Sequence, residues 1–299
     1  MTTPNSVKKS DFEVVSLKRN PTSPRTLFGL VMSSIAGLFT LLAIIPLFII
    51  LTYLITKGIS SLSLSVFSEL PPPPLVEGGG FGNAMLGTVI MVGIGALISV
   101  PLGIMAAIYL SEFNEGRISD WIRFATNVLS GVPSIIVGVF AYSAIVLTTK
   151  SYSAWAGGFA LSILMLPIIV RTTDESLKLV PQDVRQASVG VGANRYQTVL
   201  RVVLPAALPA IITGITLAVA RAAGETAPLL FTALFTQFWP NWDNLLMEPT
   251  ASLAVLVYNF AIVPFANQQE LAWGAAFILV LLVLATSIIS RVATAKRTY

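Results

Sequence analysis

Two ionisable residues stand four positions apart inside a long apolar stretch of this sequence. Arg221 and Glu225 interrupt the segment Ala206–Leu234, and on a helix this spacing puts both side chains on one face, within pairing distance. A charged residue costs roughly 2.5–3.5 kcal/mol at the centre of a bilayer, so such residues normally face protein or a wet cavity. Arginine offers a planar fork of donors to an oxyanion, whereas an ionised glutamate only accepts hydrogen bonds. The two residues are therefore either an anion site or a self-neutralising pair that helps the helix insert.

Other kinds of chemistry are poorly supported by the residue types present. The chain has no cysteine and no histidine, which excludes disulfides, thiolate nucleophiles and the commonest metal ligand and general base. It also has no GxxxxGK[ST] sequence, so it does not bind ATP through that phosphate-cradling loop. A membrane-embedded enzyme is a remote alternative. We expect no catalytic residue, no metal and no cofactor on this chain.

Three further residues are candidates for contact with an anion. Arg171 follows an apolar stretch, and its position favours a cytoplasmic membrane anchor over an anion site. Ser130 and Ser134 stand near two glycines, Gly131 and Gly138. Small residues of this kind indicate close helix packing first, and a pathway lined with hydroxyl groups second.

The polar segment 171–203 carries the most specific pattern in the chain. Its members are an amide residue, two small residues, a glycine and a leucine–proline pair at fixed spacings: Gln186, Ala187, Ser188, Gly192, Leu204 and Pro205. Val184 and Ala187 fall on one face of a short predicted helix, and Gly192 permits a sharp bend before a second one. Pro205 suits the first turn of the next span. The small residues would let a partner surface come close, although an amphipathic helix lying on the membrane has the same pattern.

The composition decides which elements hold these residues. Of the 299 residues, 55% are hydrophobic and 11% are charged, against roughly 25% charged in an ordinary soluble domain. So little polar surface argues against a soluble enzyme, a disordered chain and a nucleic-acid-binding domain. The chain is therefore predicted to be an all-α polytopic membrane protein.

Six apolar segments are long enough to cross a bilayer, which takes about 20 residues per helix. They are Leu27–Ile55, Ala84–Leu110, Phe124–Leu147, Ala154–Val170, Ala206–Leu234 and Leu271–Ile289. The first is too long for a signal peptide and is predicted to be an uncleaved anchor. A seventh segment, Ala251–Ala266, is short and contains Asn259 and Pro264, so a re-entrant helix competes with a span.

The basic residues favour six spans with both termini in the cytoplasm. Fifteen of the 18 lysine and arginine residues then lie inside and two outside, with Arg221 in a span. Seven spans would leave twelve inside and five outside, which fits the positive-inside rule less well.

We therefore expect the following organisation along the chain. Residues 1–26 are a cytoplasmic tail, 27–55 the first transmembrane helix and 56–83 an extracytoplasmic loop rich in proline and glycine. Residues 84–291 are the transmembrane core, which includes the cytoplasmic loop 171–203, and residues 292–299 are a cytoplasmic tail. The four consecutive prolines Pro71–Pro74 predict a stiff spacer.

The pattern in the cytoplasmic loop resembles the EAA loop of ABC-transporter permease subunits, written E-A-A, three residues, G, nine residues, I-x-L-P. Gln186, Ser188 and Val202 replace its glutamate, second alanine and isoleucine. Five further segments resemble the phosphate permeases of the PstA family: GNAMLGT (Gly82–Thr88), VPLGIMAAIYLSE (Val100–Glu112), LSGVPSIIVG (Leu129–Gly138), LPIIVRTTDESLKLVP (Leu166–Pro181) and ARAAGETAPLLFTA (Ala220–Ala233).

This resemblance implies a type I ABC importer permease fold, half of a phosphate pathway and several partners. These are a second permease subunit similar to PstC, two copies of a cytoplasmic ATPase similar to PstB, and an extracytoplasmic phosphate-binding protein similar to PstS. ATP and Mg would be bound by the ATPase, whose groove would receive the EAA loop. The location implied is the prokaryotic inner membrane, where the complex would work by alternating access.

If the substrate is phosphate, we expect Arg221 and Glu225 to have different roles. Arg221 would attract the anion, and Glu225 would accept from the P–OH group that hydrogen phosphate carries and sulfate lacks. The resemblance also raises the alternative that Arg171 is an exit station. Two other functions remain open: a permease for molybdate, sulfate or phosphonate, and an ATP-independent channel or secondary transporter. The latter usually shows internal repeats, and we find none.

Overall fold

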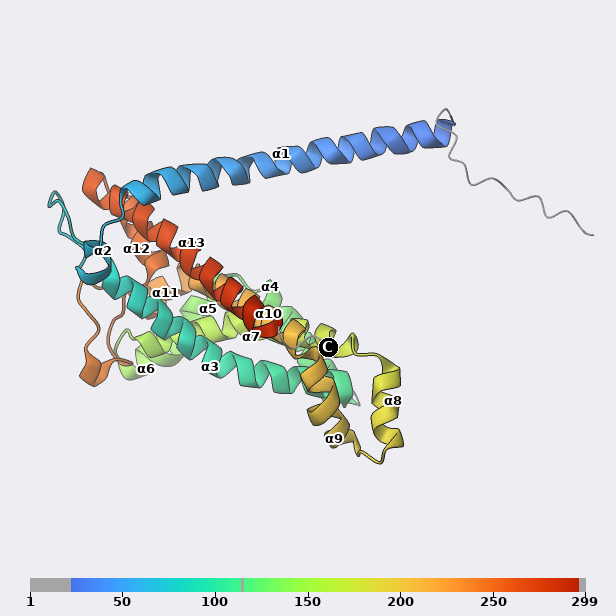
Figure 1. Cartoon of the computed structure of the whole chain (residues 1–299). Helices are drawn as coiled ribbons and strands as arrows, with labels where there is room; N and C mark the ends of the chain where they lie inside the picture. Colours follow the sequence, from blue (N-terminus) through green and yellow to red (C-terminus); the bar gives the residue numbers. More distant parts are fainter. Residues whose placement is uncertain (1–22, 114–115, 296–299) are drawn as a thin grey trace, which may run out of the picture. The chain divides into compact units, whose positions relative to one another are not determined.

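The computed structural model describes residues 23–113 and 116–295, and these residues form helices with no strand among them (Figure 1). The predicted all-helical class is thereby confirmed. The chain divides into two units, residues 1–52 and 53–299. Helix α1 (Pro24–Ser60) begins in the first unit and ends in the second. The second unit contains α2 (Ser65–Ser68), α3 (Gly82–Glu112), α4 (Arg117–Gly131), α5 (Ser134–Ala141), α6 (Leu147–Thr149), α7 (Ala154–Lys178), α8 (Gln182–Gly190), α9 (Arg195–Thr198), α10 (Leu204–Ala223), α11 (Ala227–Thr232), α12 (Leu253–Ala261) and α13 (Ala266–Ala295).

Within the described ranges, five helices are long and apolar enough to cross a membrane. They are Pro24–Ser60, Gly82–Glu112, Ala154–Lys178, Arg195–Ala223 and Ala266–Val292. The pair Arg117–Gly131 and Ser134–Thr149 makes a sixth if its two bent halves form one span. Hydropathy thus located the spans. The structure differs from the prediction in where several helices end and in the break within the third span.

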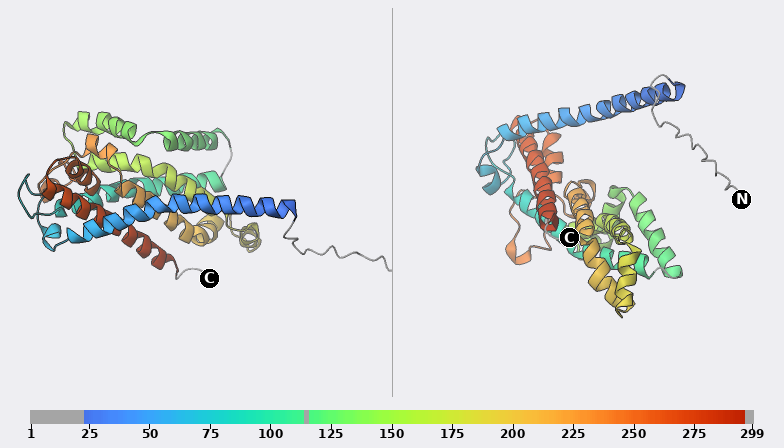
Figure 2. Two further views of the ribbon diagram at one scale, coloured as in Figure 1. Left: turned by 90° about the horizontal axis from the view of Figure 1, so that it is seen from above. Right: turned by 45° about the vertical axis from the view of Figure 1, so that its right-hand side comes forward.

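The third predicted span, Phe124–Leu147, is not one straight helix. Helix α4 ends at Gly131, α5 begins at Ser134, and the two directions differ by 106°. Proline disfavours a helical backbone in the residue before it, and Val132 before Pro133 has the extended values φ −73° and ψ 128°. The bend separates an amphipathic half, which carries Arg123, from an apolar half. Figure 2 shows the two halves as separate helices in two shades of green.

The fifth predicted span was too long at its carboxyl end. Helix α10 stops at Ala223 and the chain turns at Gly224 before α11 begins at Ala227. Glycine has the least helix propensity after proline, and Pro228 suits the first turn of the new helix. The fourth helix, by contrast, continues past its predicted end at Val170 to Lys178.

The ambiguous segment Ala251–Ala266 contains the short helix α12 and is not a candidate span of the described chain. Leu253, Val255 and Leu256 on α12 are fully buried. They belong to clusters with side chains of α3 and α13, so protein covers this helix.

The core of the second unit lies where α3, α7 and α10 meet. Met91, Leu161 and Ile169 are fully buried there. A Cβ atom at Gly158 of α7 would lie 2.5 Å from the Cβ of Ile94 on α3, so only glycine permits this approach. The close contact fixes α7, which carries Arg171, Asp174 and Lys178.

The predicted spacer before α3 packs on protein rather than standing free. Gln268 of α13 donates from Nε2 to the Pro72 carbonyl oxygen at 3.1 Å, and Asn267 donates from Nδ2 to that of Val76 at 2.6 Å. Pro71 and Pro72 are buried. The proline run therefore lies against the start of α13.

Candidate functional site

Arg221 and Glu225 form the predicted ion pair, but a helix break positions them. Arg221 lies in the last turn of α10, and Glu225 follows the turn at Gly224. The Nε atom of Arg221 lies 3.5 Å from Oε1 of Glu225. The arginine side chain is 61% exposed and the glutamate side chain 15%. The guanidinium thus has N–H donors that are accessible to an anion. Its position near the carboxyl end of a helix is also electrostatically favourable.

The backbone beyond Glu225 is supported by α5. A Cβ atom at Gly138 of α5 would lie 2.6 Å from the Cα of Pro228 in the first turn of α11. The packing interpretation of Gly138 is therefore correct, whereas a Cβ at Gly131 would meet nothing within 4 Å. Because α11 starts two residues after Glu225, the α5–α11 contact determines where that carboxylate lies.

Replacing Gly138 with alanine is expected to destabilise the chain by roughly 1–3 kcal/mol, since the added methyl group collides with backbone that has no rotamer to escape into. We expect a lower unfolding temperature for the purified complex in detergent, measured by intrinsic tryptophan fluorescence. Gly131→Ala is the matched control and should leave the transition unchanged. Equal shifts for the two variants would contradict the packing explanation.

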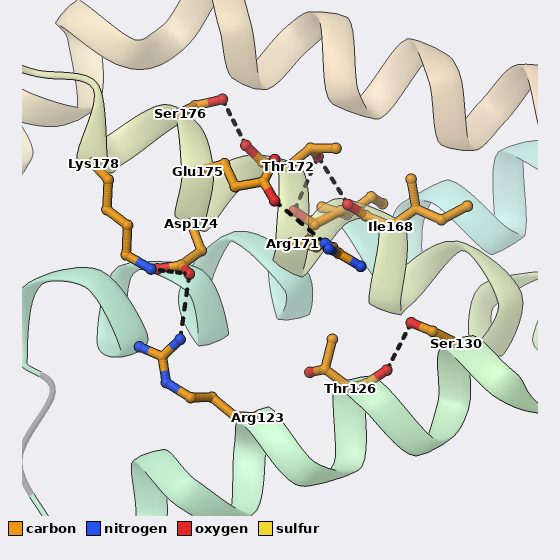
Figure 3. A network of polar contacts seen from close by, with 11 residues as sticks. Arg123, Thr126, Ser130, Ile168, Arg171, Thr172, Asp174, Glu175, Ser176 and Lys178 are labelled. Carbon is orange, nitrogen blue, oxygen red and sulfur yellow. Dashed lines mark hydrogen bonds and ion pairs between the residues drawn. The ribbon is translucent and has the colours of Figure 1, made fainter.

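Arg171 lies in a small polar pocket between α4 and α7, not at a helix end. Its Nε atom lies 3.3 Å from Oε1 of Glu175, and both side chains are largely exposed. The pocket has a volume of about 250 Å³ and is lined by residues of α3, α4 and α7: Leu110, Arg123, Thr126, Asn127, Val170, Arg171, Asp174, Glu175 and Lys178. Figure 3 shows Arg171 and Glu175 together on α7, above the side chains that α4 contributes.

Ser130 and Ser134 lie on opposite sides of the bend between α4 and α5. Ser130 is exposed and donates from Oγ to the Thr126 carbonyl oxygen at 2.8 Å. Figure 3 shows Thr126 and Ser130 on the side of α4 that faces α7. Ser134 is the first residue of α5 and is half-buried. The two serines on either side of the bend thus differ in exposure to solvent.

Asp174 is a buried charged residue that the sequence reasoning missed. It is 8% exposed, and its Oδ2 atom lies 3.6 Å from Nη1 of Arg123 on α4 and 2.5 Å from Nζ of Lys178 on α7. Its Oδ1 atom is buried and has no hydrogen-bond partner among the described residues. The four-residue spacing to Lys178 was a visible signal, whereas the contact with Arg123 depends on how α4 folds back on α7 (Figure 3).

Arg171 and Arg221 lie on helices that pack together but do not share a pocket. Helices α7 and α10 approach closely at Thr172 and Gly214, where glycine leaves room for the threonine side chain. Arg221 is not among the residues that line the Arg171 pocket. The chain thus presents two separate cationic positions.

The loop 171–203 contains the two predicted short helices and the bend between them, but residues 171–178 belong to α7, and α9 continues through residues 199–203 into the long helix Arg195–Ala223. Gly192 has a φ of +91°, which glycine adopts readily, and Asn194 caps α9 in a reciprocal arrangement with Gln197. Pro205 lies in the first turn of α10, next to Leu204. Figure 1 shows α8 and α9 at the end of the bundle.

The loop residues of the EAA-like pattern differ in accessibility. Gln186 and Ala187 are exposed on α8, as is Gly192 after it. Ser188 is buried and its Oγ lies 3.0 Å from Oγ1 of Thr198 on α9. A groove of about 710 Å³ runs beside α8 and is lined by Glu112, Gln182, Arg185, Gln186, Val189, Gly190, Ala193, Arg195, Thr198 and Val199. Ser188 therefore joins the two helices instead of facing a partner.

Comparison with known proteins gives one consistent result. Residues 99–298 match the family described as "Binding-protein-dependent transport system inner membrane component". The chain is 42% identical over 270 residues to a phosphate transport system permease protein, PstA, of Yersinia pestis, which covers 90% of each chain.

Solved structures are similar in fold. A chain of a bacterial alginate ABC transporter superposes with a TM-score of 0.58 and 12% identity, over 91% of this chain and 96% of that one. A chain of the MetNI methionine ABC transporter superposes with a TM-score of 0.56 and 18% identity, over 73% and 94%. The architecture is that of a type I ABC importer permease.

Proposed function

Because the chain belongs to the family of binding-protein-dependent transport system inner membrane components, we propose a route by which its residues pass phosphate across the membrane. The chain is a multi-pass inner-membrane permease, not an ATPase, and is the permease component of a phosphate ABC transport system. Such a permease works with an ATPase and a binding protein. The location of both termini in the cytoplasm is part of the proposal.

The observation that carries the proposal is the ion pair at the break after α10. Arg221 is mostly exposed although it ends an apolar helix, and its fork can hold two phosphate oxygens. Glu225 is mostly buried beside it and can accept from the P–OH group of hydrogen phosphate. Sulfate has no such donor, so the same carboxylate repels it and no hydrogen bond offsets that repulsion. The pair therefore combines attraction with discrimination.

The pocket around Arg171 is the proposed exit station. Arg123, Arg171 and Lys178 bring three positive charges to its walls, and Asp174 and Glu175 bring two negative charges. Most of the charge is thus neutralised inside the protein, which favours brief residence of an anion over tight binding. Ser130 is proposed to contact phosphate through its hydroxyl on the way to this pocket. Ser134 lies on the other side of the bend between α4 and α5.

The partners proposed are a second permease similar to PstC, two copies of an ATPase similar to PstB, and a phosphate-binding protein similar to PstS. The ATPase, which holds ATP and Mg, receives the exposed side of α8 at Gln186 and Ala187. Its closure moves the loop, and the two permeases alternate between outward-facing and inward-facing states.

The proposed function is tested by uptake of labelled phosphate into liposomes that contain the chain with these three kinds of partner. We expect uptake that requires ATP and that unlabelled phosphate inhibits. Uptake that persists without ATP would indicate a channel or secondary transporter. Stronger inhibition by molybdate, sulfate or phosphonate than by phosphate would identify another oxyanion as the substrate.

A further inference from the structure

The carboxyl end of α3 is held by the cytoplasmic loop through one buried ion pair. Glu112 is the last residue of α3, and Nη1 of Arg185 on α8 donates to its Oε1 at 2.5 Å and its Oε2 at 2.6 Å. The two side chains are only 9% and 16% exposed. This interaction joins residues that are 73 positions apart in the chain.

The same guanidinium also holds the end of α7. Nη2 of Arg185 donates to the Leu177 carbonyl oxygen at 2.7 Å, and Nε donates to that of Val180 at 3.4 Å. The last carbonyl groups of a helix lack their usual partner within it, so the bond to Leu177 satisfies an acceptor in the last turn of α7, and Val180 lies two residues after that helix ends. One arginine therefore connects α3, α7 and α8.

The second helix of the loop contacts the same end of α3. Nη2 of Arg195 on α9 donates to the Glu112 carbonyl oxygen, and its guanidinium carbon lies 4.8 Å from the centre of the Phe113 ring. The Tyr196 ring packs on that of Phe113, with centres 5.2 Å apart. Both helices of the loop thus contact the end of α3, one through the Glu112 side chain and the other through its backbone.

We infer that Glu112 is a positioning residue for coupling: through Arg185 it makes α3 follow the cytoplasmic loop when the ATPase moves that loop. Helices α7 and α10 continue directly into the loop, so its movement reaches them through the chain itself. Helix α3 has no peptide link to the loop: it packs along α7, and its carboxyl end is joined to the loop through Arg185, Arg195 and Tyr196. A buried ion pair with charge-assisted hydrogen bonds transmits displacement well because its separation is costly. This inference rests on the proposed docking of an ATPase at α8.

The test measures ATP hydrolysed per phosphate transported, in liposomes that contain the complete complex. We expect Glu112→Gln and Arg185→Gln each to raise this ratio by roughly tenfold, because without the buried pair only the α9 contacts join the loop to the end of α3, so α3 follows the loop less completely. The double variant Glu112→Gln/Arg185→Gln should be no worse than the poorer single variant, since both changes remove one interaction. Asp120→Asn, which neutralises an exposed carboxylate on α4, is the matched control and should keep the parental ratio.

Several outcomes separate this inference from its alternatives. Parallel loss of hydrolysis and uptake by fully assembled variants would overturn it and leave the pair a purely stabilising role. Multiplying effects in the double variant would overturn the pairing. If Glu112→Gln does not assemble, Glu112→Asp keeps the charge with a shorter reach, and a normal ratio in that variant would also overturn the inference. A parent complex that shows no ATP-dependent uptake would instead refute the proposed function itself.

Discussion

Replacing Arg221 with alanine is expected to lower phosphate uptake by about 100-fold while the complex still assembles and hydrolyses ATP. A bidentate arginine supplies two charge-assisted hydrogen bonds, and losing them costs about 3 kcal/mol, or roughly two factors of ten. The guanidinium ends α10 with most of its surface exposed, so few packing contacts are lost with it. The measurement is labelled phosphate uptake beside ATP hydrolysis in the same liposomes.

Two further variants separate charge from geometry in this result. Arg221→Lys keeps the positive charge but loses the planar fork, so uptake should fall between those of the parent and the alanine variant. Arg117→Ala removes an exposed arginine from the start of α4 and should transport normally. Normal uptake by Arg221→Ala would mean that the ion pair with Glu225 serves only the insertion and folding of α10.

Replacing Glu225 with glutamine is expected to remove most of the discrimination between phosphate and sulfate. The neutral amide no longer repels sulfate and can donate a hydrogen bond to it, whereas the P–OH group loses a charged acceptor. A hydrogen bond to a charged group contributes about 1.5–3 kcal/mol, so the affinity ratio should fall by roughly 10- to 100-fold. The carboxylate is only 15% exposed, which limits compensation by water.

The measurement must exclude the selectivity of the binding protein. We therefore propose equilibrium binding of labelled phosphate and labelled sulfate to the purified permease–ATPase complex without that protein. Glu270→Gln, which neutralises an exposed carboxylate in the first turns of α13, is the control and should keep the parental ratio. Sulfate binding by Glu225→Gln that is no better than that of the parent would falsify the discriminating role of Glu225.

The features that were predicted correctly from the sequence involve residues that are close together in the chain. They include the Arg221–Glu225 pair, the two short helices of the loop 171–203 and the bend at Gly192. Residues so close in the chain stay neighbours whether a helix continues or turns at a glycine, as it does at Gly224, so residue types alone indicated these features. Hydropathy likewise located the spans, because each span must be apolar by itself wherever its neighbours lie.

The tertiary structure decided what depends on segments that are far apart in the chain. The bend at Pro133 turns α4 back along α7 and brings Arg123 to Asp174, and the course of α3 brings Glu112 to Arg185. Proline and glycine marked where helices break, but they do not specify the angle of a bend. That angle follows from which side chains the packed helices can bury together. The sequence therefore determined the approximate spans, the loop and the charged pair, while packing determined the pocket around Arg171 and the link between the loop and α3.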